Sequence, residues 1–419
     1  MSANGKDREI LRALAGQVAE IAALPVQQET TAAWKALNGL KPVRPMVMID
    51  QIPWHEMDVD EELALETSDP FCRDVETRLR RLLYRWRHQR VDMVVEPVLE
   101  FGKVIRGLDF GMQRVEELAL TDPQNDVVSH RYVDQLQMGE DLEKIRMPKV
   151  VLDEQATARI EERARELFDG VIEIEMQGNF PCFAVWDRIV EWRGAEPLLW
   201  DLADRPEHMH RIMYRLTEAQ LAMLDQLEAQ GLLGSVQSTI HCTGAHTDEL
   251  PAAGFDPARP RAKDLWTYGM AQIFSSVSPE MHREFEIDYT VRWYQRFGLG
   301  YYGCCEPLHD KIDLIRKIPN VRKISMSPWV DVTKGAERIG GDFAFSRKPS
   351  PAFLAGDTWE PEAVARDLGD TVAQCKRKGC PLELILKDIS TVGYRPERLW
   401  AWADIAMEAV GAGSGIVAH

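Results

Sequence analysis

The sequence predicts an α/β fold: a single (β/α)8 barrel of the TIM type, preceded by a helical extension. About eight short apolar, β-branched runs recur along the 419 residues, and most are followed by an amphipathic helical pattern. Strands that alternate with helices favour a parallel sheet. Eight such units favour a closed barrel, and barrels of this kind run from about 200 to more than 400 residues. A doubly wound sheet with one extra domain is the alternative.

Residues 1–42 are expected to form the helical extension. Apolar residues recur at helical spacing from Ile10 to Leu24, and Pro25 ends this run. A second short helix is expected over Thr30–Leu40, before the break at Gly39–Pro42. The barrel would then span residues 43–419.

The barrel strands are expected in the apolar runs and its helices between them. The predicted strands are Pro45–Asp50, Val91–Glu100, Val171–Phe180, Leu232–Ile240, Leu299–Cys305, Val321–Pro328, Asp342–Pro349 and Leu382–Ser390. The predicted helices include Asp74–His88, Thr157–Leu167, Pro206–Gln230, Ser278–Phe297 and Pro361–Lys378. A Pro- and Gly-rich loop insertion is expected at about 241–270. Because long loops in compact domains are usually functional or disordered, we expect it to cover the barrel mouth as a lid.

Composition excludes several classes of function. Lys plus Arg total 50 and Asp plus Glu total 67, which gives a net charge of −17. A chain this acidic lacks the basic surface of a nucleic-acid binder and is repelled by anionic lipid. No apolar stretch reaches 18 residues, and the first residues lack the apolar core of a signal peptide. The seven scattered cysteines do not form a disulfide framework, so a cytoplasmic protein with reduced thiols is expected.

The ends of the predicted strands supply the candidate site, because barrel enzymes place their chemistry there. Cys304, Cys305 and Glu306 follow one strand and are the sharpest feature, with His241 after the preceding strand. Zn²⁺ takes Cys sulfur, His nitrogen and carboxylate oxygen. Adjacent residues on a strand point to opposite faces, so we expect only one of the two cysteines to face the mouth. Packing is the competing interpretation, because a free Cys often serves as a small buried hydrophobe.

Three stretches resemble the uroporphyrinogen decarboxylase-like superfamily, over roughly Pro45 to the C-terminus. They are EWRGAEPLLWDLADRPEHMHRIM (Glu191–Met213), IFSSVSPEMHREFEIDY (Ile273–Tyr289), and the order GCCEP, ISMSPWVDV and FSRKPSP. The resemblance implies a single (β/α)8 barrel. It also implies one of two activities, which are cofactor-free decarboxylation of uroporphyrinogen and zinc-dependent methyl transfer to or from a corrinoid.

The matched motifs favour methyl transfer. The decarboxylases carry an Arg-rich segment of the RQAGRYLP type after strand one, where this chain has IDQIPWHEM (Ile49–Met57). The methyltransferases carry His-x-Cys-Gly after strand five, and Cys305 falls on their ligand cysteine. Gly303 replaces the ligand histidine, Glu306 replaces the glycine, and Asp388 stands near their later ligand cysteine. His241, Glu306 and Asp388 are therefore the expected substitutes around a rebuilt zinc site.

The resemblance implies a zinc-dependent methyltransferase that moves a methyl group between a small methylated substrate, such as a methoxyaromatic compound, and a corrinoid. Zinc would act as a Lewis acid on the methylated atom. The chain has no DxHxxG segment, so a separate corrinoid protein would carry the cobalamin, and a homodimer is expected. The candidate residues are Glu306, Asp388, Lys387 and His55 for catalysis, Trp54, Glu96, Asn179, Tyr302, Trp329 and Lys348 for substrate binding, and Cys305, His241 and Glu306 for the metal.

Two alternatives stay open. The first is a cofactor-free decarboxylase or lyase that uses Lys348, Lys387 and Asp388. The second is a non-catalytic barrel that binds a tetrapyrrole or corrinoid as a carrier. Lys387 and Asp388 are also compatible with a structural ion pair, and His55 with a surface position.

Overall fold

A six-stranded parallel sheet forms the centre of the protein in a computed structural model, which describes residues 5–58, 60–119, 129–235 and 237–411. Its order is β1-β14-β13-β12-β11-β10. The strands are β1 (Met46–Ile49), β10 (Trp266–Gly269), β11 (Leu299–Tyr302), β12 (Val321–Met326), β13 (Ala344–Arg347) and β14 (Leu382–Leu386). Every residue of β1, β11, β13 and β14 is buried. Burial on both faces is typical of parallel strands covered by helices.

A second parallel pair continues this arrangement. Strand β2 (Val98–Gly102) pairs with β7 (Glu173–Gln177), so that Glu100 lies opposite Glu175. Isolated bridges join Asn179 to Leu233 and Phe183 to Gly269, and the second bridge leads to β10. The mixed α/β architecture is consistent with a TIM-type barrel. Within the described ranges, the strands do not form one closed hydrogen-bonded ring.

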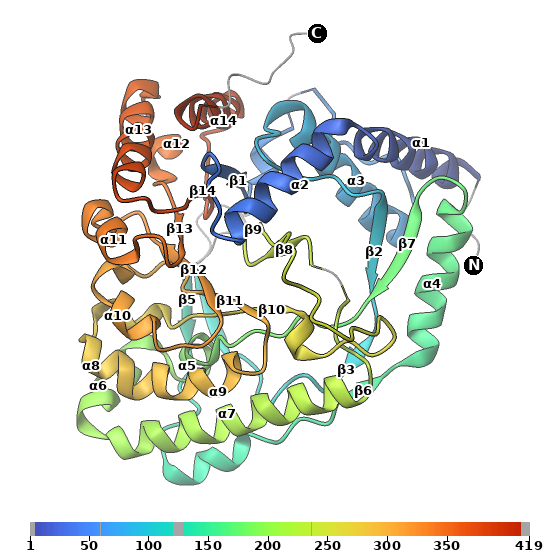
Figure 1. Ribbon diagram of the computed structural model, residues 1–419. Helices are drawn as coiled ribbons and strands as arrows, with labels where there is room; N and C mark the ends of the chain where they lie inside the picture. Colours follow the sequence, from blue (N-terminus) through green and yellow to red (C-terminus); the bar gives the residue numbers. More distant parts are fainter. Residues whose placement is uncertain (1–4, 59, 120–128, 236, 412–419) are drawn as a thin grey trace.

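Helices surround these strands, as Figure 1 shows. The longer ones are α3 (Pro70–His88), α4 (Glu154–Phe168), α5 (Val185–Arg193), α6 (Ala195–Asp204), α7 (Pro206–Ala229), α9 (Asp288–Tyr294), α11 (Val332–Ile339), α13 (Pro361–Arg377) and α14 (Glu397–Ala409). Shorter helices are α8 (Pro279–His282), α10 (Ile312–Ile315) and α12 (Ala352–Ala355). The predicted helix Ser278–Phe297 is interrupted by a π-helical turn at Arg283–Ile287. None of the described helices is both long and apolar enough to cross a membrane.

Two helices occupy the predicted N-terminal extension. Helix α1 (Gly5–Ala22) packs against α3 and α4. Helix α2 (Pro25–Asn38) begins earlier than predicted, because Pro25 is its first residue and not a terminator. Proline suits the first helical turn, where its missing N–H costs nothing. Trp34 and Leu37 of α2 pack on Met46 and Met48, so this helix covers β1.

The fourth predicted strand and the predicted lid are both wrong. Within Leu232–Ile240 the described residues hold only the bridge at Leu233 and the short β8 (Thr239–Ile240), which pairs antiparallel with β9 (Thr243–Gly244); Val236 lies outside the described residues. The real sheet strand is β10, inside the predicted loop insertion. The first residue of β10 bonds to a side chain from the 232–240 segment and not to a strand backbone. The backbone N–H of Trp266 donates to Gln237 Oε1 at 2.8 Å.

The segment after His241 runs through the barrel interior and does not cover the mouth. The Gly244 carbonyl accepts from Lys323 Nζ at 3.0 Å, near the start of β12. Glu249 pairs with Arg322 at the same end of that strand. Thr243 finds a buried partner in Glu383, whereas Asp248 and Glu249 pair with Lys35 and Arg322 at the surface.

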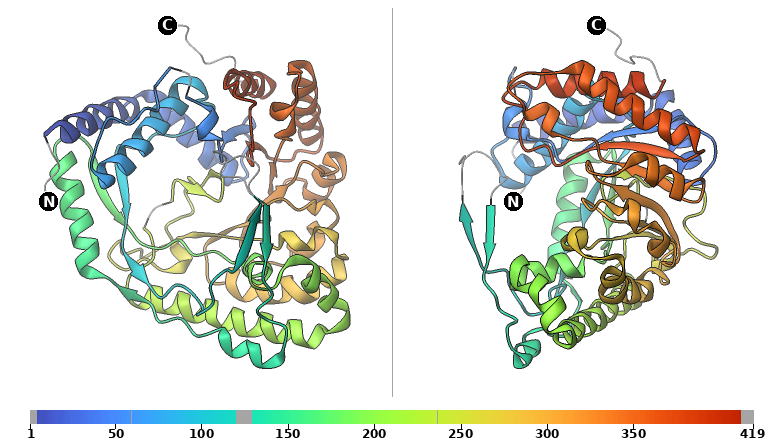
Figure 2. Two further views of the ribbon diagram at one scale, coloured as in Figure 1. Left: turned by 180° about the vertical axis from the view of Figure 1, so that it is seen from behind. Right: turned by 90° about the vertical axis from the view of Figure 1, so that its left-hand side faces the viewer.

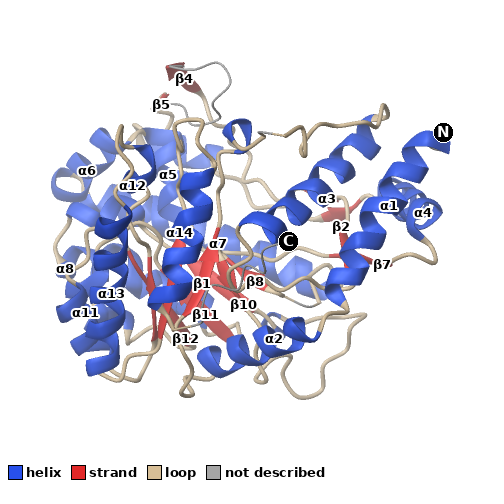
Figure 3. Cartoon of the chain, turned by 90° about the horizontal axis from the view of Figure 1, so that it is seen from above, coloured by secondary structure: helices blue, strands red, loops and turns tan. Residues whose placement is uncertain are grey.

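The long connection between β2 and β7 contains two small antiparallel pairs that the sequence did not predict. Strand β3 (Ile105–Arg106) pairs with β6 (Val151–Leu152), and β4 (Glu116–Ala119) pairs with β5 (Ser129–Tyr132). Figures 2 and 3 show β4 and β5 projecting from the body of the protein.

Candidate active site

Two thiols meet at the end of β11. The strand stops at Tyr302, and Gly303 turns the chain with a φ of 95°. The two thiol sulfurs, Cys304 Sγ and Cys305 Sγ, then lie 3.5 Å apart. The expectation that they face opposite sides is wrong, because the left-handed glycine ends strand geometry before the first cysteine. Glycine adopts this conformation without a steric penalty.

Three further side chains, His241, Lys387 and Asp388, lie against the two cysteines. We call these five residues the thiol cluster. His241 Nε2 lies 3.3 Å from Cys304 Sγ. Lys387, directly after β14, places Nζ 3.0 Å from the same sulfur. The Cys305 thiol donates to Asp388 Oδ2 at 3.3 Å. The structure therefore brings together four predicted site residues and Cys304, at the carboxyl ends of β11 and β14.

The cluster shifts the pKa values of the two cysteines in opposite directions. The contact with Cys305 Sγ and the Lys387 ammonium lower the pKa of Cys304, although burial opposes them. The hydrogen bond to Cys304, burial and the nearby Asp388 raise the pKa of Cys305. Burial disfavours the charge of Lys387, but the Cys304 thiolate and Asp388 raise its pKa above the ordinary value. The contact between the Lys387 ammonium and Cys304 thus favours the ionised form of this thiol, as cations beside reactive cysteines do.

His241 is a neutral member of the cluster. Burial and the nearby ammonium groups of Lys348 and Lys387 lower its pKa to about 2. Its ring stacks on Tyr268 with centroids 5.0 Å apart. Both His241 (φ 54°) and Asp388 (φ 56°) adopt left-handed backbone conformations. Such strained residues concentrate at functional sites.

Lys348 lies deeper in the barrel, in a polar group that sequence reasoning identified only in part. Its Nζ contacts the Tyr301 hydroxyl and donates to Ser346 Oγ at 2.8 Å. Burial lowers the pKa of Lys348 to about 8. Tyr301 stands one residue before Tyr302, so the two rings point in opposite directions on β11.

Tyr302 does not line the site, which corrects its predicted substrate-binding role. The side chain is fully buried, and its hydroxyl lies 2.7 Å from His282 Nε2 on α8. It joins the barrel wall to the surrounding helices. Trp329, in contrast, is 76% exposed to solvent, and it forms none of the contacts described for the thiol cluster.

Glu306 supports the cluster from below, which corrects its predicted roles as ligand and catalytic group. Its carboxylate accepts from the Cys304 N–H at 2.6 Å and from the Ala271 N–H at 3.0 Å. Burial raises its pKa, while these backbone hydrogen bonds oppose the rise. The carboxylate fixes the turn that carries both cysteines, and its two oxygens are already occupied.

The other predicted residues lie in neighbouring parts of the barrel. His55 contacts Glu56 at 3.6 Å, in the loop after β1. Glu96 lies near Glu100 and Glu175, and burial together with these carboxylates raises its pKa. Asn179 is held by backbone hydrogen bonds to the 232–234 segment. The structure does not place these residues in the thiol cluster.

A cavity of about 320 Å³ gives access to His241, and Ser238, Thr239 and Tyr268 also line it. A larger pocket of about 490 Å³ lies beside it and shares Ser238 and Thr239. Trp54 lines the larger pocket together with Arg78, Arg81 and Arg85 of α3. Sequence reasoning missed these arginines, although their spacing of three and four residues places them on one helix face.

The donor set has the chemistry of a zinc site but not its arrangement. Two thiols and an imidazole are ligands that Zn²⁺ prefers. Among the described residues, however, no three His, Cys, Asp or Glu side chains are arranged to hold a metal ion. The Lys387 ammonium instead occupies a position next to the Cys304 sulfur. The residues present do not fit zinc in this conformation.

Comparison with solved structures gives a similar fold in a methyltransferase from Methanosarcina mazei. The similarity covers 90% of this chain and 98% of that chain, with a TM-score of 0.52 and 13% sequence identity. At this identity the likeness is one of fold. No protein-family model matches the chain, and neither does any curated protein sequence. The relation inferred from the sequence is thus supported at the level of the fold.

Proposed function

We propose that the chain is a methyltransferase that moves a methyl group between a small methylated substrate and a corrinoid carried by a partner protein. The observation that carries this proposal is the 3.0 Å contact between Lys387 Nζ and Cys304 Sγ. The contact sets a lysine ammonium against a cysteine of lowered pKa at the strand ends, where barrel enzymes bind their substrates. The fold likeness to a methyltransferase supports the reaction class.

The reaction requires that the negative charge which develops on the atom losing the methyl group be neutralised. A bound corrinoid would supply the partner for the methyl group. When the bond between the methyl carbon and oxygen or nitrogen breaks, the electron pair stays on the heteroatom, which must then gain a proton. An ammonium carries three donors, and Lys387 Nζ lies 3.0 Å from Cys304 Sγ and 3.5 Å from Asp388 Oδ2. Lys387 can therefore donate the proton to the departing heteroatom.

Cys304 keeps this donor charged and placed. Its thiolate raises the pKa of Lys387, so the lysine remains an ammonium before the reaction. In the reverse direction, the thiolate can take the proton of a hydroxyl or thiol that accepts the methyl group. Cys305 Sγ lies 3.5 Å from the Cys304 sulfur and Glu306 fixes the turn, so both act by positioning.

The test measures methyl transfer to reduced free cobalamin from a panel of methanol, trimethylamine and methoxybenzene, followed by the absorbance of methylcobalamin. We expect Lys387→Met to lower the rate by about 10²–10⁴, the usual contribution of general acid catalysis. Lys376→Met is the matched control, since Lys376 is exposed on α13, and it should leave the rate unchanged. Full activity in both Lys387→Met and Cys304→Ser would overturn the proposal.

Zinc remains a prediction of the resemblance, and elemental analysis of the same samples tests it. About one zinc per chain in the wild type, lost in Cys305→Ala, would mean that the thiols rearrange around a metal. Absence of zinc from an active enzyme would support the thiolate–ammonium pair as the working centre.

Decarboxylation is the second candidate, because the buried ammonium groups of Lys348 and Lys387 lie near each other beside His241. Such cations can stabilise a carbanion left by departing CO₂. Release of CO₂ from a small carboxylic acid in a chelated sample, without methyl transfer, would favour it. Tight corrinoid binding with neither reaction would favour a carrier.

A further inference from the structure

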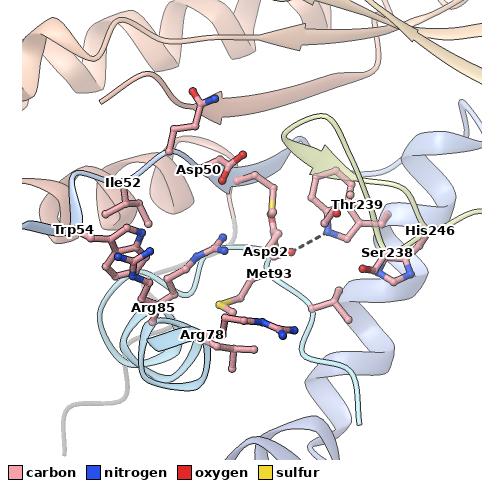
Figure 4. A pocket seen from close by; sticks show the side chains of 17 residues that line it. Asp50, Ile52, Trp54, Arg78, Arg85, Asp92, Met93, Ser238, Thr239 and His246 are labelled. Atoms are coloured by element: carbon pink, nitrogen blue, oxygen red, sulfur yellow. Dashed lines mark hydrogen bonds between the residues drawn. The ribbon is translucent and has the colours of Figure 1, made fainter. Parts of the chain in front are cut away.

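The pocket of about 490 Å³ beside the thiol cluster has the features of an anion site. It lies between the end of β1 and helix α3, and the 238–246 segment forms its far side. Figure 4 shows Arg78 and Arg85 extending into it from α3, with Trp54 on one side and Ser238 and His246 on the other. Its size falls in the range of small-molecule sites.

Its cations are held by backbone carbonyls. Arg85 Nη2 donates to the Ile49 carbonyl at 2.9 Å, and Arg78 Nη2 donates to the Glu100 carbonyl at 2.7 Å. Among the described residues, neither arginine forms an ion pair. The buried Nε of Arg85 has no hydrogen-bond partner. Burial lowers the pKa of Arg85, and only the nearby Asp50 opposes this effect. The guanidinium charge is therefore incompletely compensated.

The carboxylates of the pocket do not cancel this charge. Asp92 is already bound by Arg44, with contacts of 2.6 and 2.9 Å, and by the Val47 N–H at 2.8 Å. Asp50 is the other acidic residue in the lining. His246 adds no negative charge, and burial lowers its pKa to about 4, so it is neutral at pH 7. Arg78 and Arg85 therefore bring two guanidinium groups to a pocket whose own lining offers Asp50 as its remaining acidic residue, although Glu100 also lies near Arg78.

Aromatic walls flank these cations. Trp54 lies under the Arg81 guanidinium, with 4.9 Å from Cζ to the ring centroid. Trp34 is fixed by its Nε1–H, which donates to the Asp92 carbonyl at 2.8 Å. Met48, Ile52, Leu82, Met93 and Val94 complete the apolar lining. Such a site combines an apolar body with a charged end.

One wall connects the pocket directly to the thiol cluster. Gln51 lines the pocket, and its Oε1 accepts from the Asp388 N–H at 3.1 Å. Asp388 in turn accepts from the Cys305 thiol. Gln51 thus forms the boundary between the pocket and the thiol cluster.

We propose that this pocket binds a substrate with an oxyanion end, a carboxylate or phosphate, through Arg78 and Arg85, and with an aromatic or alkyl body between Trp34 and Trp54. This assignment deepens the proposed function, since the end near Gln51 would present the methylated atom to Lys387. Arginine suits either anion, because its planar fork gives bidentate hydrogen bonds to both.

Isothermal titration with benzoate, phenyl phosphate and benzamide tests the proposal without any methyl transfer, so failure of the reaction and failure of the pocket are distinguishable. We expect benzoate or phenyl phosphate to bind at least about tenfold more tightly than benzamide, which has the same ring without the charge. The preferred anion identifies the group. We also expect the anion affinity to fall when the salt concentration is raised from about 50 to about 500 mM, because salt screens the attraction between the anion and the arginines.

Variants locate the binding. Arg85→Gln and, separately, Arg78→Gln should each weaken anion binding about tenfold or more. Loss of the Arg85 contact to the Ile49 carbonyl could impair folding of Arg85→Gln. In that case Arg78→Gln alone tests the proposal. Arg87→Gln is the matched control on the same helix, because Arg87 pairs with Glu62 outside the pocket and should bind as wild type. Equal binding of benzamide, no binding by a folded wild type, or full affinity in Arg78→Gln would overturn the proposal.

Discussion

Cys304 differs from Cys305 because of its neighbours and not because of its residue type. Both cysteines follow the same strand, yet Lys387 contacts the first and Asp388 accepts from the second. The sequence indicated a functional thiol at this point but selected Cys305, since the resemblance aligned it with a ligand position. The partners come from β14, about 80 residues later, and no local pattern reports such a contact.

The thiolate–ammonium pair predicts a specific pH dependence. A cation within hydrogen-bonding distance favours the ionised thiol, so removal of the cation must raise its pKa. We expect the thiolate absorbance at 240 nm to appear at lower pH in the wild type than in Lys387→Met. The midpoint should rise by about one pH unit or more in the variant.

Two controls isolate this titration. Cys304→Ser should abolish the low-pH transition, whereas Lys376→Met should leave it in place. An unchanged midpoint in Lys387→Met would mean that Lys387 does not stabilise the thiolate in solution.

The end of β11 shows how an element positions chemistry. Gly303 adopts a φ of 95°, and a Cβ built there would lie 2.5 Å from Leu308 Cδ1 and 3.0 Å from Ser325 Cβ. Gly303→Ala should therefore cost about 1–3 kcal/mol in the free energy of unfolding. It should also reduce methyl transfer, because the turn that carries both thiols must shift.

Gly340 provides the control for this prediction. It also has a positive φ, 53°, but a Cβ there meets no atom within 4 Å. Gly340→Ala should cost about 1–3 kcal/mol from backbone strain alone and should leave activity unchanged. Urea unfolding and the methyl-transfer assay on both variants make the comparison. Equal effects of the two substitutions on methyl transfer would contradict a special role for the β11 turn.

At the scale of the whole molecule, the sequence predicted the periodic parts of the fold and missed what long-range contacts decide. Helices such as α7 and α13 and the apolar strands β1, β12 and β14 follow local patterns. Strand β10 has only four residues inside a Pro- and Gly-rich stretch, so its pairing with β11 is what defines it. The α3 arginines line a pocket only because α3 packs beside β1, which helical periodicity alone does not indicate.

A buried ion pair joins distant parts of the barrel. Lys323 of β12 and Glu383 of β14 are both fully buried, with Nζ and Oε2 2.7 Å apart. Thr243 donates to the same carboxylate at 2.8 Å, and the Trp34 ring of α2 lies 5.1 Å from Lys323 Nζ. Burial lowers the pKa of Lys323, and Glu383 opposes this effect. The pair thus links two strands, the interior segment and the N-terminal helices.

Removing one partner should be worse than removing both. Either Lys323→Met or Glu383→Leu leaves an uncompensated charge in the barrel, at a cost of about 3–5 kcal/mol in the free energy of unfolding. In the double variant no charge remains buried, so its cost should be smaller than the sum of the two single costs. Urea unfolding of the four proteins completes the cycle. If the two costs simply add, Lys323 and Glu383 do not stabilise each other, and the interior segment is held by its other hydrogen bonds.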